Sequence, residues 1–267
     1  MTSNTNYLEI NKNSWNKRTE IHITSEFYDV EGFIKGKSSL NEIELGIFPD
    51  LKGKKVLHLQ CHFGQDSISL SRMGAKVTGI DLSDKAIESA IELNKTCNTD
   101  AEFICCDIYD LPNHLNEQFD FVFTSYGTIG WLPDLNKWGK VISTFLKPGG
   151  QFIFVEFHPV VWMFDDNFDK VGYNYLNTGE IIETASGTYT DLNAPITQDY
   201  VCWNHGIAEV LMGLINNGIE INSMEEYDFS PYNCFNDTVE EYAPKRHRVK
   251  HFDNKIPMVY SIVASKK

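Results

Sequence analysis

Short apolar runs alternate with amphipathic stretches between Lys54 and Glu156, and this alternation constrains the fold more than any other feature of the sequence. Apolar runs of strand length, separated by segments with helical spacing, are typical of a parallel sheet covered by helices. The predicted strands read KVLHLQ, KVTGID, EFICCD, NEQFDFVFTSY and QFIFVEF. The predicted helices between them read QDSISLSRMG, SDKAIESAIELNKTCN and LNKWGKVISTFL, the last ended by the turn KPGG.

The segments on either side of this core have a different character. After Pro159 about forty aromatic-rich residues read as loop, and a loop of that length is more often a functional cap than a connector. Regular patterns return with a predicted helix, GIAEVLMGLINNG, and two predicted strands, IEINSMEEYDF and PMVYSIVASK. Before Lys54 we expect an amphipathic helical segment, anchored by Trp15, Ile21 and Phe27, that packs over one end of the sheet.

Charge and composition narrow the classes of function. The net charge of −14 disfavours a nucleic-acid partner, because binding to a phosphate backbone depends on clustered lysine and arginine. The short basic cluster at 245–250 is expected to be a solvated loop. No apolar run approaches the roughly 18 residues that a membrane span needs, and the polar start lacks the apolar core of a secretory signal. We therefore expect a cytoplasmic protein with no membrane partner.

The ends of the predicted strands indicate the ligand, because sheets of this kind bind ligands beyond the carboxyl ends of their strands. A dinucleotide turn needs several glycines so that its backbone can approach a pyrophosphate. VLHLQCHFGQDS keeps only Gly64 and has Gln60 and His62 at the other positions. Asp81 is placed to accept hydrogen bonds from ribose, and Asp107 from an adenine amino group. An adenosine that carries an amino acid, S-adenosylmethionine, meets these requirements, although both aspartates could instead be helix caps.

Several motifs resemble those of class I S-adenosylmethionine-dependent methyltransferases over roughly residues 50 to 265. They are VLHLQCHFG, VTGIDLS, CCDIYDLP, FDFVFTSYGTIGWL and LKPGGQFIFVE. LHLQCHFGQDS, SYGTIGWLPDL and EFHP resemble more narrowly a poorly characterised bacterial branch of small-molecule methyltransferases. The resemblance implies an α/β, Rossmann-like, doubly wound fold, with a seven-stranded, mostly parallel sheet and an antiparallel last strand. To this fold the residue pattern adds an N-terminal helical lid and an insert after the fifth strand.

The cofactor turn departs from the pattern of the family. The family usually has an acid at the position of His58, where it helps to hold the cofactor's ammonium, and glycines at the positions of Gln60 and His62. His58 and Gln60 are therefore our candidates for contacts with the methionine end. A metal shared by His58 and His62 is not expected, because the two straddle a strand and a turn. The residues expected to bind the cofactor are Tyr28, His58, Gln60, Cys61, His62, Gly64, Asp81, Leu82, Asp107, Ile108 and Thr124.

The acceptor site is less constrained than the cofactor site. The prolines and the acid or amide that mark nucleic-acid amino-methyltransferases are absent from Thr124 to Tyr126, which argues against bases as acceptors. Histidine is the usual side chain for removing a proton near neutral pH, so His158 and then His205 are the candidates for a general base. The expected catalytic residues are thus His158, His205 and Tyr126, and the expected substrate-binding residues are Trp131, Trp203, His22 and Arg18. For each of them a packed or surface role remains the alternative.

The sequence therefore predicts in-line methyl transfer from S-adenosylmethionine to a small-molecule acceptor, with no metal. A non-catalytic module that binds S-adenosylmethionine or another adenosine metabolite is the alternative, and a nicotinamide oxidoreductase is least favoured because its pyrophosphate would not fit the turn. We expect one methyltransferase domain over 1–267, as a monomer or homodimer. Its parts would be a helical lid (1–50), a cofactor-binding half (51–159), a substrate-cap insert (160–205) and a C-terminal helix with strands (206–267).

Overall fold

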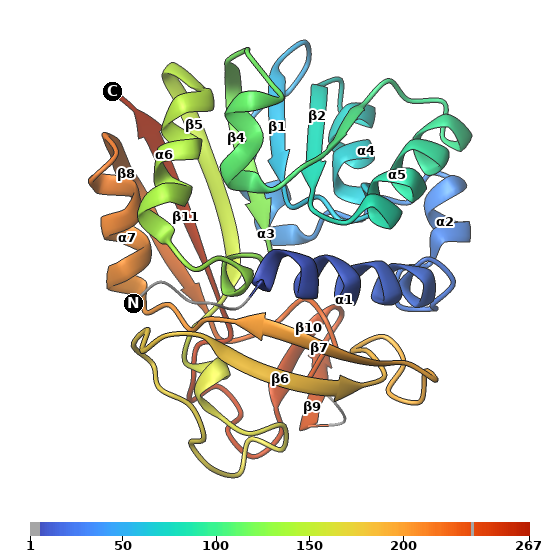
Figure 1. Ribbon diagram of the computed structural model, residues 1–267, viewed down its shortest axis with the longest axis vertical. Coiled ribbons are helices and arrows are strands. Elements are labelled where there is room, and N and C mark those ends of the chain that lie inside the picture. The colour runs from blue at the N-terminus through green and yellow to red at the C-terminus, as the bar shows by residue number, and fades with distance from the viewer. Residues whose placement is uncertain (1–5, 236–237) are drawn as a thin grey trace.

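A seven-stranded sheet forms the centre of the molecule (Figure 1). The computed structural model describes residues 6–235 and 238–267. The strands of the sheet are β1 (Lys55–Leu59), β2 (Lys76–Asp81), β3 (Glu102–Cys105), β4 (Phe119–Ser125), β5 (Leu146–Phe157), β8 (Ile219–Tyr227) and β11 (Val259–Lys266). They lie in the order β3-β2-β1-β4-β5-β11-β8. β1 to β5 pair in parallel, whereas the last strand, β11, is antiparallel to both β5 and β8. This topology confirms the predicted Rossmann-like, doubly wound fold.

Helices cover both faces of the sheet, which explains why its central strands are apolar along their length. One face is covered by α3 (Glu42–Ile47) and α4 (Gln65–Arg72), with α5 (Asp84–Thr96) beside them. The other face is covered by η1 (Ile108–Asn113), α6 (Leu135–Phe145) and α7 (Ile207–Ile215). Successive strand residues point to opposite faces, so Val56 packs near Leu70 and Leu57 lies in the cluster that contains Trp138.

The carboxyl ends of the parallel strands face a second layer of the molecule. Helix α1 (Tyr7–His22) runs across this edge of the sheet and separates it from two antiparallel hairpins (Figure 1). The hairpins are formed by β6 (Ile181–Ser186) with β7 (Thr197–Cys202), and by β9 (Val239–Ala243) with β10 (Arg246–Val249). The remaining short elements are α2 (Val30–Ile34), η2 (Ile129–Trp131) and η3 (Val161–Met163).

The buried face of α1 is polar, contrary to the expected apolar anchoring. The anchors Trp15, Ile21 and Phe27 are only half-buried, whereas the buried side chains of the helix are Asn11, Ser14, Arg18, Thr19 and His22. Asn11 explains part of this pattern. Its Nδ2 donates to the carbonyl of Val201 and its Oδ1 accepts from the amide of Val201, both at 2.8 Å, so that it pairs with β7 as a neighbouring strand would.

Three other expectations about local structure were wrong. The predicted turn KPGG opens β5, where the register with β4 shifts, and Gly149 takes a φ of +75°. Residues 160–205 contain the β6–β7 hairpin in addition to loop. The basic cluster at 245–250 contains β10, which pairs with β9, instead of a solvated loop. Acidic neighbours pair with two of its residues, Arg246 with Glu42 and Arg248 with Asp228. Within the described ranges, no helix is both long enough and apolar enough to cross a membrane.

Candidate functional site

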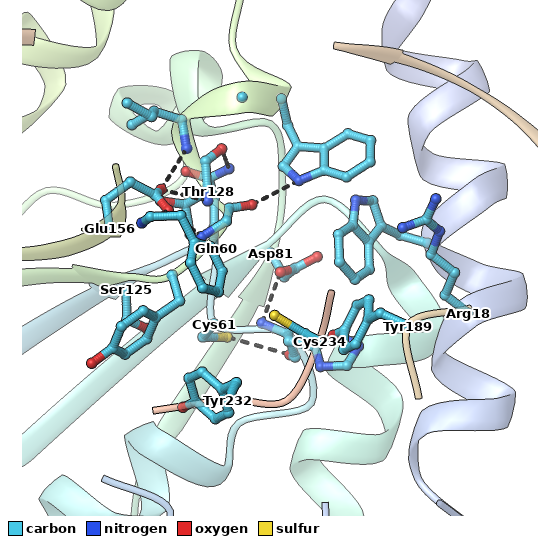
Figure 2. Close-up of a pocket in the computed structure, with 18 of the residues that line it drawn as sticks. Arg18, Gln60, Cys61, Asp81, Ser125, Thr128, Glu156, Tyr189, Tyr232 and Cys234 are labelled. Atoms are coloured by element: carbon cyan, nitrogen blue, oxygen red, sulfur yellow. Dashed lines mark hydrogen bonds between the residues drawn. The ribbon is translucent and has the colours of Figure 1, made fainter. Parts of the chain in front are cut away.

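A cavity of about 850 Å³ lies where the carboxyl ends of the sheet strands face α1 and the hairpins (Figure 2). Its walls come from α1, from the loops that follow β1 to β5, from β6 and β7, and from the loop after β8. Most of the predicted site residues line it: Arg18, Tyr28, His58, Gln60, Cys61, His62, Gly64, Asp81, Leu82, Asp107, Ile108, Tyr126, Trp131, Trp203 and His205. His22, Thr124 and His158 lie outside this lining. The cavity thus brings together residues that are far apart in the sequence.

The turn after β1 keeps a backbone conformation that usually requires glycine. Gln60 and His62 have φ values of +54° and +51°, and Gly64 has a φ of +82°. For an L-residue this left-handed conformation costs roughly 1–2 kcal/mol. At Gly64 there is also no room for a side chain, because a Cβ would lie 2.8 Å from the ring of Phe103. Gln60 and His62 therefore hold a glycine-like backbone conformation and add two side chains to the cavity wall.

Asp81 connects this turn to the end of β2. One carboxylate oxygen accepts from the amide of His62 at 2.8 Å (Figure 2). The other accepts from the amide of Ser83 at 2.9 Å. Burial raises the pKa of Asp81 to about 6, although these amide hydrogen bonds oppose the shift. An ionised carboxylate has about four acceptor sites, so Asp81 keeps acceptor capacity beyond its bonds to backbone amides, and it lines the cavity. Asp81 can therefore hold the turn and accept a ligand hydroxyl at the same time.

Asp107 occupies the corresponding position after β3. It accepts from the amide of Tyr109 at 3.2 Å and so caps η1. Burial raises its pKa, and the hydrogen bond to Tyr109 opposes the shift. It lines the cavity between Cys106 and Ile108, whose side chains are buried. The capping role that the sequence left open is thus present, and a role toward a ligand is compatible with it.

His58 is buried and neutral. Its Nδ1 lies 2.8 Å from Oγ of Ser67, and its ring stacks on Phe123 with 4.9 Å between ring centroids. Burial lowers the pKa of His58 to about 3, so this imidazole does not supply the negative charge of the usual acid. Two buried atoms in this part of the wall lack a hydrogen-bond partner, His58 Nε2 and Gln60 Oε1. Gln60 Oε1 is an acceptor and fits a ligand ammonium.

Glu156, at the end of β5, organises the loop that follows β4. Its carboxylate accepts hydrogen bonds from the amides of Gly127, Thr128 and Ile129 and from the hydroxyl of Thr128 (Figure 2). The amide of Gln60 in turn donates to the carbonyl of Thr128 at 2.9 Å. Burial raises the pKa of Glu156, and the backbone hydrogen bonds oppose the shift. The sequence pattern assigned this residue no role, because a lone glutamate at a strand end has no characteristic spacing.

Helix α1 and the segments packed beside it contribute aromatic and cationic side chains to the opposite wall. Arg18 lies among the rings of Trp15, Trp131 and Tyr200, with its guanidinium carbon 5.3–5.4 Å from each ring centroid. Trp131 is held by a hydrogen bond from its indole nitrogen to the carbonyl of Gly127 at 2.8 Å. Tyr28 shares a hydrogen bond of 2.5 Å with Tyr189, and the ring of Trp203 meets that of Tyr7 edge to face.

Two histidines form the contact between the lid and the turn. His22 Nδ1 on α1 lies 3.3 Å from His62 Nε2, with ring centroids 5.1 Å apart. Burial lowers the pKa of His62 to about 3, with a further contribution from Arg18. Burial, the facing imidazole and Arg18 lower the pKa of His22 to about 2. His22 therefore packs behind the wall and His62 faces the cavity.

The three predicted catalytic residues are all engaged with neighbours. His158 points away from the cavity, with Nε2 2.9 Å from Glu226 and Nδ1 accepting from the amide of Val160. His205 places Nε2 2.8 Å from the carbonyl of Leu132 and Nδ1 3.1 Å from Glu209.

The hydroxyl of Tyr126 donates to Glu44 at 2.8 Å, and burial followed by the charge of Glu44 raises its pKa well above the usual value. Thr124 bonds within the core to the carbonyl of Leu59 and the hydroxyl of Thr128.

Sequence reasoning missed an acidic part of the wall. Asp66 on α4 lies near Ser125, whose hydroxyl is 3.4 Å from it, and desolvation raises the pKa of Asp66. Glu44, fully buried behind Tyr126, also has a pKa raised by burial. Tyr232 closes this corner of the cavity with its ring 5.0 Å from that of Tyr126. No motif marks these residues, since they meet only through the fold. Over the described residues, no three His, Cys, Asp or Glu side chains form a group suited to a metal ion.

Parts of this chain are similar in sequence to known proteins. Residues 56–150 match the family described as a methyltransferase domain. The ubiquinone biosynthesis O-methyltransferase of Idiomarina loihiensis is 29% identical over 136 residues, which cover 49% of this chain and 56% of that protein. The chain thus spans little more than half the length of this relative.

Solved structures share the whole fold at low sequence identity. An S-adenosylmethionine-dependent methyltransferase from Mesorhizobium loti is 21% identical with a TM-score of 0.61, and the match covers 87% of this chain and 100% of that chain. Geranyl diphosphate C-methyltransferase from Streptomyces coelicolor A3(2), solved with Mg²⁺, geranyl diphosphate and S-adenosyl-L-homocysteine, is 14% identical with a TM-score of 0.60 and full coverage of both chains. At these identities the likeness establishes a common fold.

Proposed function

We propose, from the premise that this chain belongs to the class I S-adenosylmethionine-dependent methyltransferases, that it transfers the cofactor's methyl group to a small-molecule acceptor in the described cavity. S-adenosylmethionine supplies a methyl group activated on a sulfonium. The observation that carries the proposal is the continuity of the cavity, which runs from Asp81 and Asp107 to the aromatic side chains of the lid. Cavities of about 300–1,000 Å³ accommodate drug-sized ligands, and 850 Å³ is near the upper end.

The chain's own residues would position the cofactor from two sides. Asp81 would accept hydrogen bonds from ribose hydroxyls and Asp107 from the adenine amino group, with Leu82 and Ile108 beside them. At the methionine end, Gln60 would accept from the ammonium through its unpartnered Oε1. This neutral acceptor would take the place of the family's acid as a hydrogen-bond partner of the ammonium, without supplying its negative charge.

The lid and the insert would align the acceptor and exclude water. In an in-line displacement the nucleophile attacks the methyl carbon from the side opposite the sulfonium sulfur. Alignment of this kind can contribute about 7–11 kcal/mol. We propose that residues 1–50 and 160–205 supply this wall, with Trp131 and Trp203 against the acceptor. Glu156 would hold the loop 127–129 in place at the cavity wall.

An acceptor that carries a proton at neutral pH needs a base. His158 has no access to the cavity, and His205 and Tyr126 are already bonded to neighbours, so we assign them no proton transfer. Asp66 is the carboxylate that we propose for this role, because it lines the cavity and its desolvation raises the pKa. Asp66→Asn should then abolish methyl transfer without weakening the binding of S-adenosylhomocysteine. Unchanged turnover would remove Asp66 from the mechanism.

Isothermal titration calorimetry with S-adenosylmethionine and S-adenosylhomocysteine tests the proposal. Native protein should bind both, and Asp81→Asn should weaken binding by about 1–3 kcal/mol through the loss of charge-assisted hydrogen bonds. Asp100→Asn is the matched control, since this exposed aspartate lies outside the cavity lining. Folded protein that binds neither compound would refute the assignment. A mass-spectrometric screen for methylated metabolites would then separate an enzyme from a non-catalytic binding module.

A further inference from the structure

Arg18 is a buried cation at the wall of the cavity. Its side chain leaves α1 and lies beside Trp15 and Trp131 (Figure 2). The residue is only 9% exposed, yet it is part of the cavity lining. Three aromatic rings surround the guanidinium and attract it through their π faces. The group is therefore held in place by neutral neighbours.

No acid of the described residues neutralises this charge. Arg18 forms no ion pair with a described carboxylate, and its Nε is buried without a hydrogen-bond partner. The acidic groups near enough to influence it are the hydroxyls of Tyr189 and Tyr200 and the thiol of Cys202. Burial raises the pKa of Tyr189 and of Cys202 to about 12, and that of Tyr200 also rises, so all three are uncharged at neutral pH.

The other arginines of the chain make a clear contrast. Arg72 donates to the carbonyls of Phe33 and Lys37 at 3.0 and 3.1 Å. Arg246 forms a two-point pair with Glu42 at 2.8 and 2.9 Å, and Arg248 pairs with Asp228. Arg72 is half-buried and bonded to carbonyls, and Arg246 and Arg248 are paired with acids, although Arg248 Nε itself has no partner. Arg18, in contrast, is buried with an unpartnered Nε and no described acid beside it. Because an unpaired charge is costly to bury, its retention at a cavity wall points to a partner that arrives with a ligand.

We propose that Arg18 binds a carboxylate or a comparable anionic group of a molecule held in the cavity. A guanidinium presents planar, paired donors that match a carboxylate, and the surrounding rings keep water away from the contact. The anion has two possible sources, the α-carboxylate of S-adenosylmethionine and an acidic group of the methyl acceptor. This choice of sources rests on the proposed function, but the presence of an anion site does not.

Calorimetry with the full chain separates the two sources. The ligands are S-adenosylhomocysteine and 5′-methylthioadenosine, which lacks the amino acid, and the variants are Arg18→Met, Arg18→Lys and the control Lys17→Met. Lys17 lies on the same helix but is exposed and bonds only to the carbonyl of Thr197. If Arg18 holds the cofactor, Arg18→Met weakens S-adenosylhomocysteine about 10- to 100-fold and leaves 5′-methylthioadenosine within about threefold.

If Arg18 holds the acceptor, Arg18→Met binds both adenosine ligands with the affinity of the wild type. A second pair of ligands, benzoate and benzamide, then reports on the anion site. Wild-type protein, alone and with S-adenosylhomocysteine, should then prefer benzoate to neutral benzamide by tenfold or more, and Arg18→Met should abolish the preference. Arg18→Lys, which keeps the charge but not the paired donors, should fall between the two. Lys17→Met should behave as the wild type in both arms.

The melting temperature, Tm, distinguishes a ligand-binding role of Arg18 from a structural role, because the two roles predict changes of Tm in different directions. Removing an uncompensated buried charge should leave Tm unchanged or raise it by a few degrees, whereas loss of a structural arginine would lower it. The proposal is overturned if Arg18→Met changes neither the affinity ratio of S-adenosylhomocysteine to 5′-methylthioadenosine nor that of benzoate to benzamide. Arg18→Lys takes its place in this test if the methionine variant does not fold. Failure of the wild type to bind either adenosine compound would instead refute the proposed function, and the benzoate comparison on the free protein would still test the anion site.

Discussion

The sheet-side wall of the cavity, formed by residues 60–64 with Asp81 and Asp107, is held by backbone geometry, whereas the lid-side wall, formed by α1 and β7, is held by side chains. In the sheet-side wall a left-handed turn follows β1 and is bonded to Asp81 through the amide of His62. In the lid-side wall, the buried amide of Asn11 ties α1 to the edge of β7. Backbone geometry tolerates a change of side chain, but a polar contact between elements does not.

This difference explains which residues could be replaced. The turn accommodates Gln60 and His62 in a left-handed backbone conformation that glycine adopts most readily. In the lid-side wall the buried face of α1 consists of polar side chains, and contacts such as that of Asn11 with β7 depend on the identity of the side chain. The walls meet at His22 and His62, whose imidazoles are 3.3 Å apart.

The largest effect is expected where the backbone of the sheet-side wall is most crowded. Gly64→Ala should destabilise the protein by about 2–5 kcal/mol, from the left-handed φ and from overpacking against Phe103. Gly53→Ala is the control, since Gly53 has a similar φ of +73° and open space around its Cβ position. Urea unfolding measures both. Equal losses at the two sites would show that packing at Gly64 contributes nothing.

The next largest effect is expected from a substitution that disrupts the lid-side wall. Asn11→Ala leaves the buried amide and carbonyl of Val201 without partners and should cost about 2–4 kcal/mol. Hydrogen exchange should accelerate in α1 and in the β6–β7 hairpin before it does in the central sheet. Asn13→Ala, on the exposed face of the same helix, should change neither property. Uniform acceleration over the whole sheet would mean that the lid-side wall is not a separate unit.

The contact between the walls should be sensitive to acid. The pKa of His62 is lowered from 6.5 to about 3, so between these values the unfolded chain binds a proton that the folded chain does not. Stability is therefore lost as pH falls from about 6.5 toward 3. His62→Gln should reduce this slope by about 1.4 kcal/mol per pH unit.

The raised pKa of Asp81, about 6, acts in the opposite direction, since the folded chain gains a proton first. Comparison of the variant with the wild type at each pH cancels this contribution. Chemical unfolding from pH 7 to pH 5 gives the slopes. His114→Gln, at an exposed imidazole, is the control, and an unaltered slope in His62→Gln would contradict the buried neutral state.

The smallest effect tests the strain in the turn directly. At positions 60 and 62 the glycine variant should be more stable than the alanine variant by about 1 kcal/mol, because only alanine keeps the left-handed penalty. At Glu88, on the exposed face of α5, the order should reverse, since glycine disfavours a helix by about 1 kcal/mol relative to alanine. The same order at all three positions would show that the turn is relaxed.

Much of the sheet-side wall could be predicted because its signals are local. Strand periodicity placed β1 to β5, and topology requires the carboxyl ends of parallel strands to meet at one edge, which brings Gly64, Asp81 and Asp107 together. The β6–β7 hairpin gave no such signal, since its residues alternate in exposure without an apolar face to mark a strand. The direction of His158 was equally hidden, because one step along a strand decides which face a side chain joins.

The sequence by itself determined the α/β fold, the position of the turn after β1 and the placement of Asp81 and Asp107 at neighbouring strand ends, because hydrophobic period and chain order fix all three. Only the tertiary structure decided that Arg18 lies among three aromatic rings with no described acid beside it, and that Asp66 faces the cavity in place of His158. These are contacts between segments far apart in the chain. Their charge balance depends on burial and distance, which no local pattern of residues records.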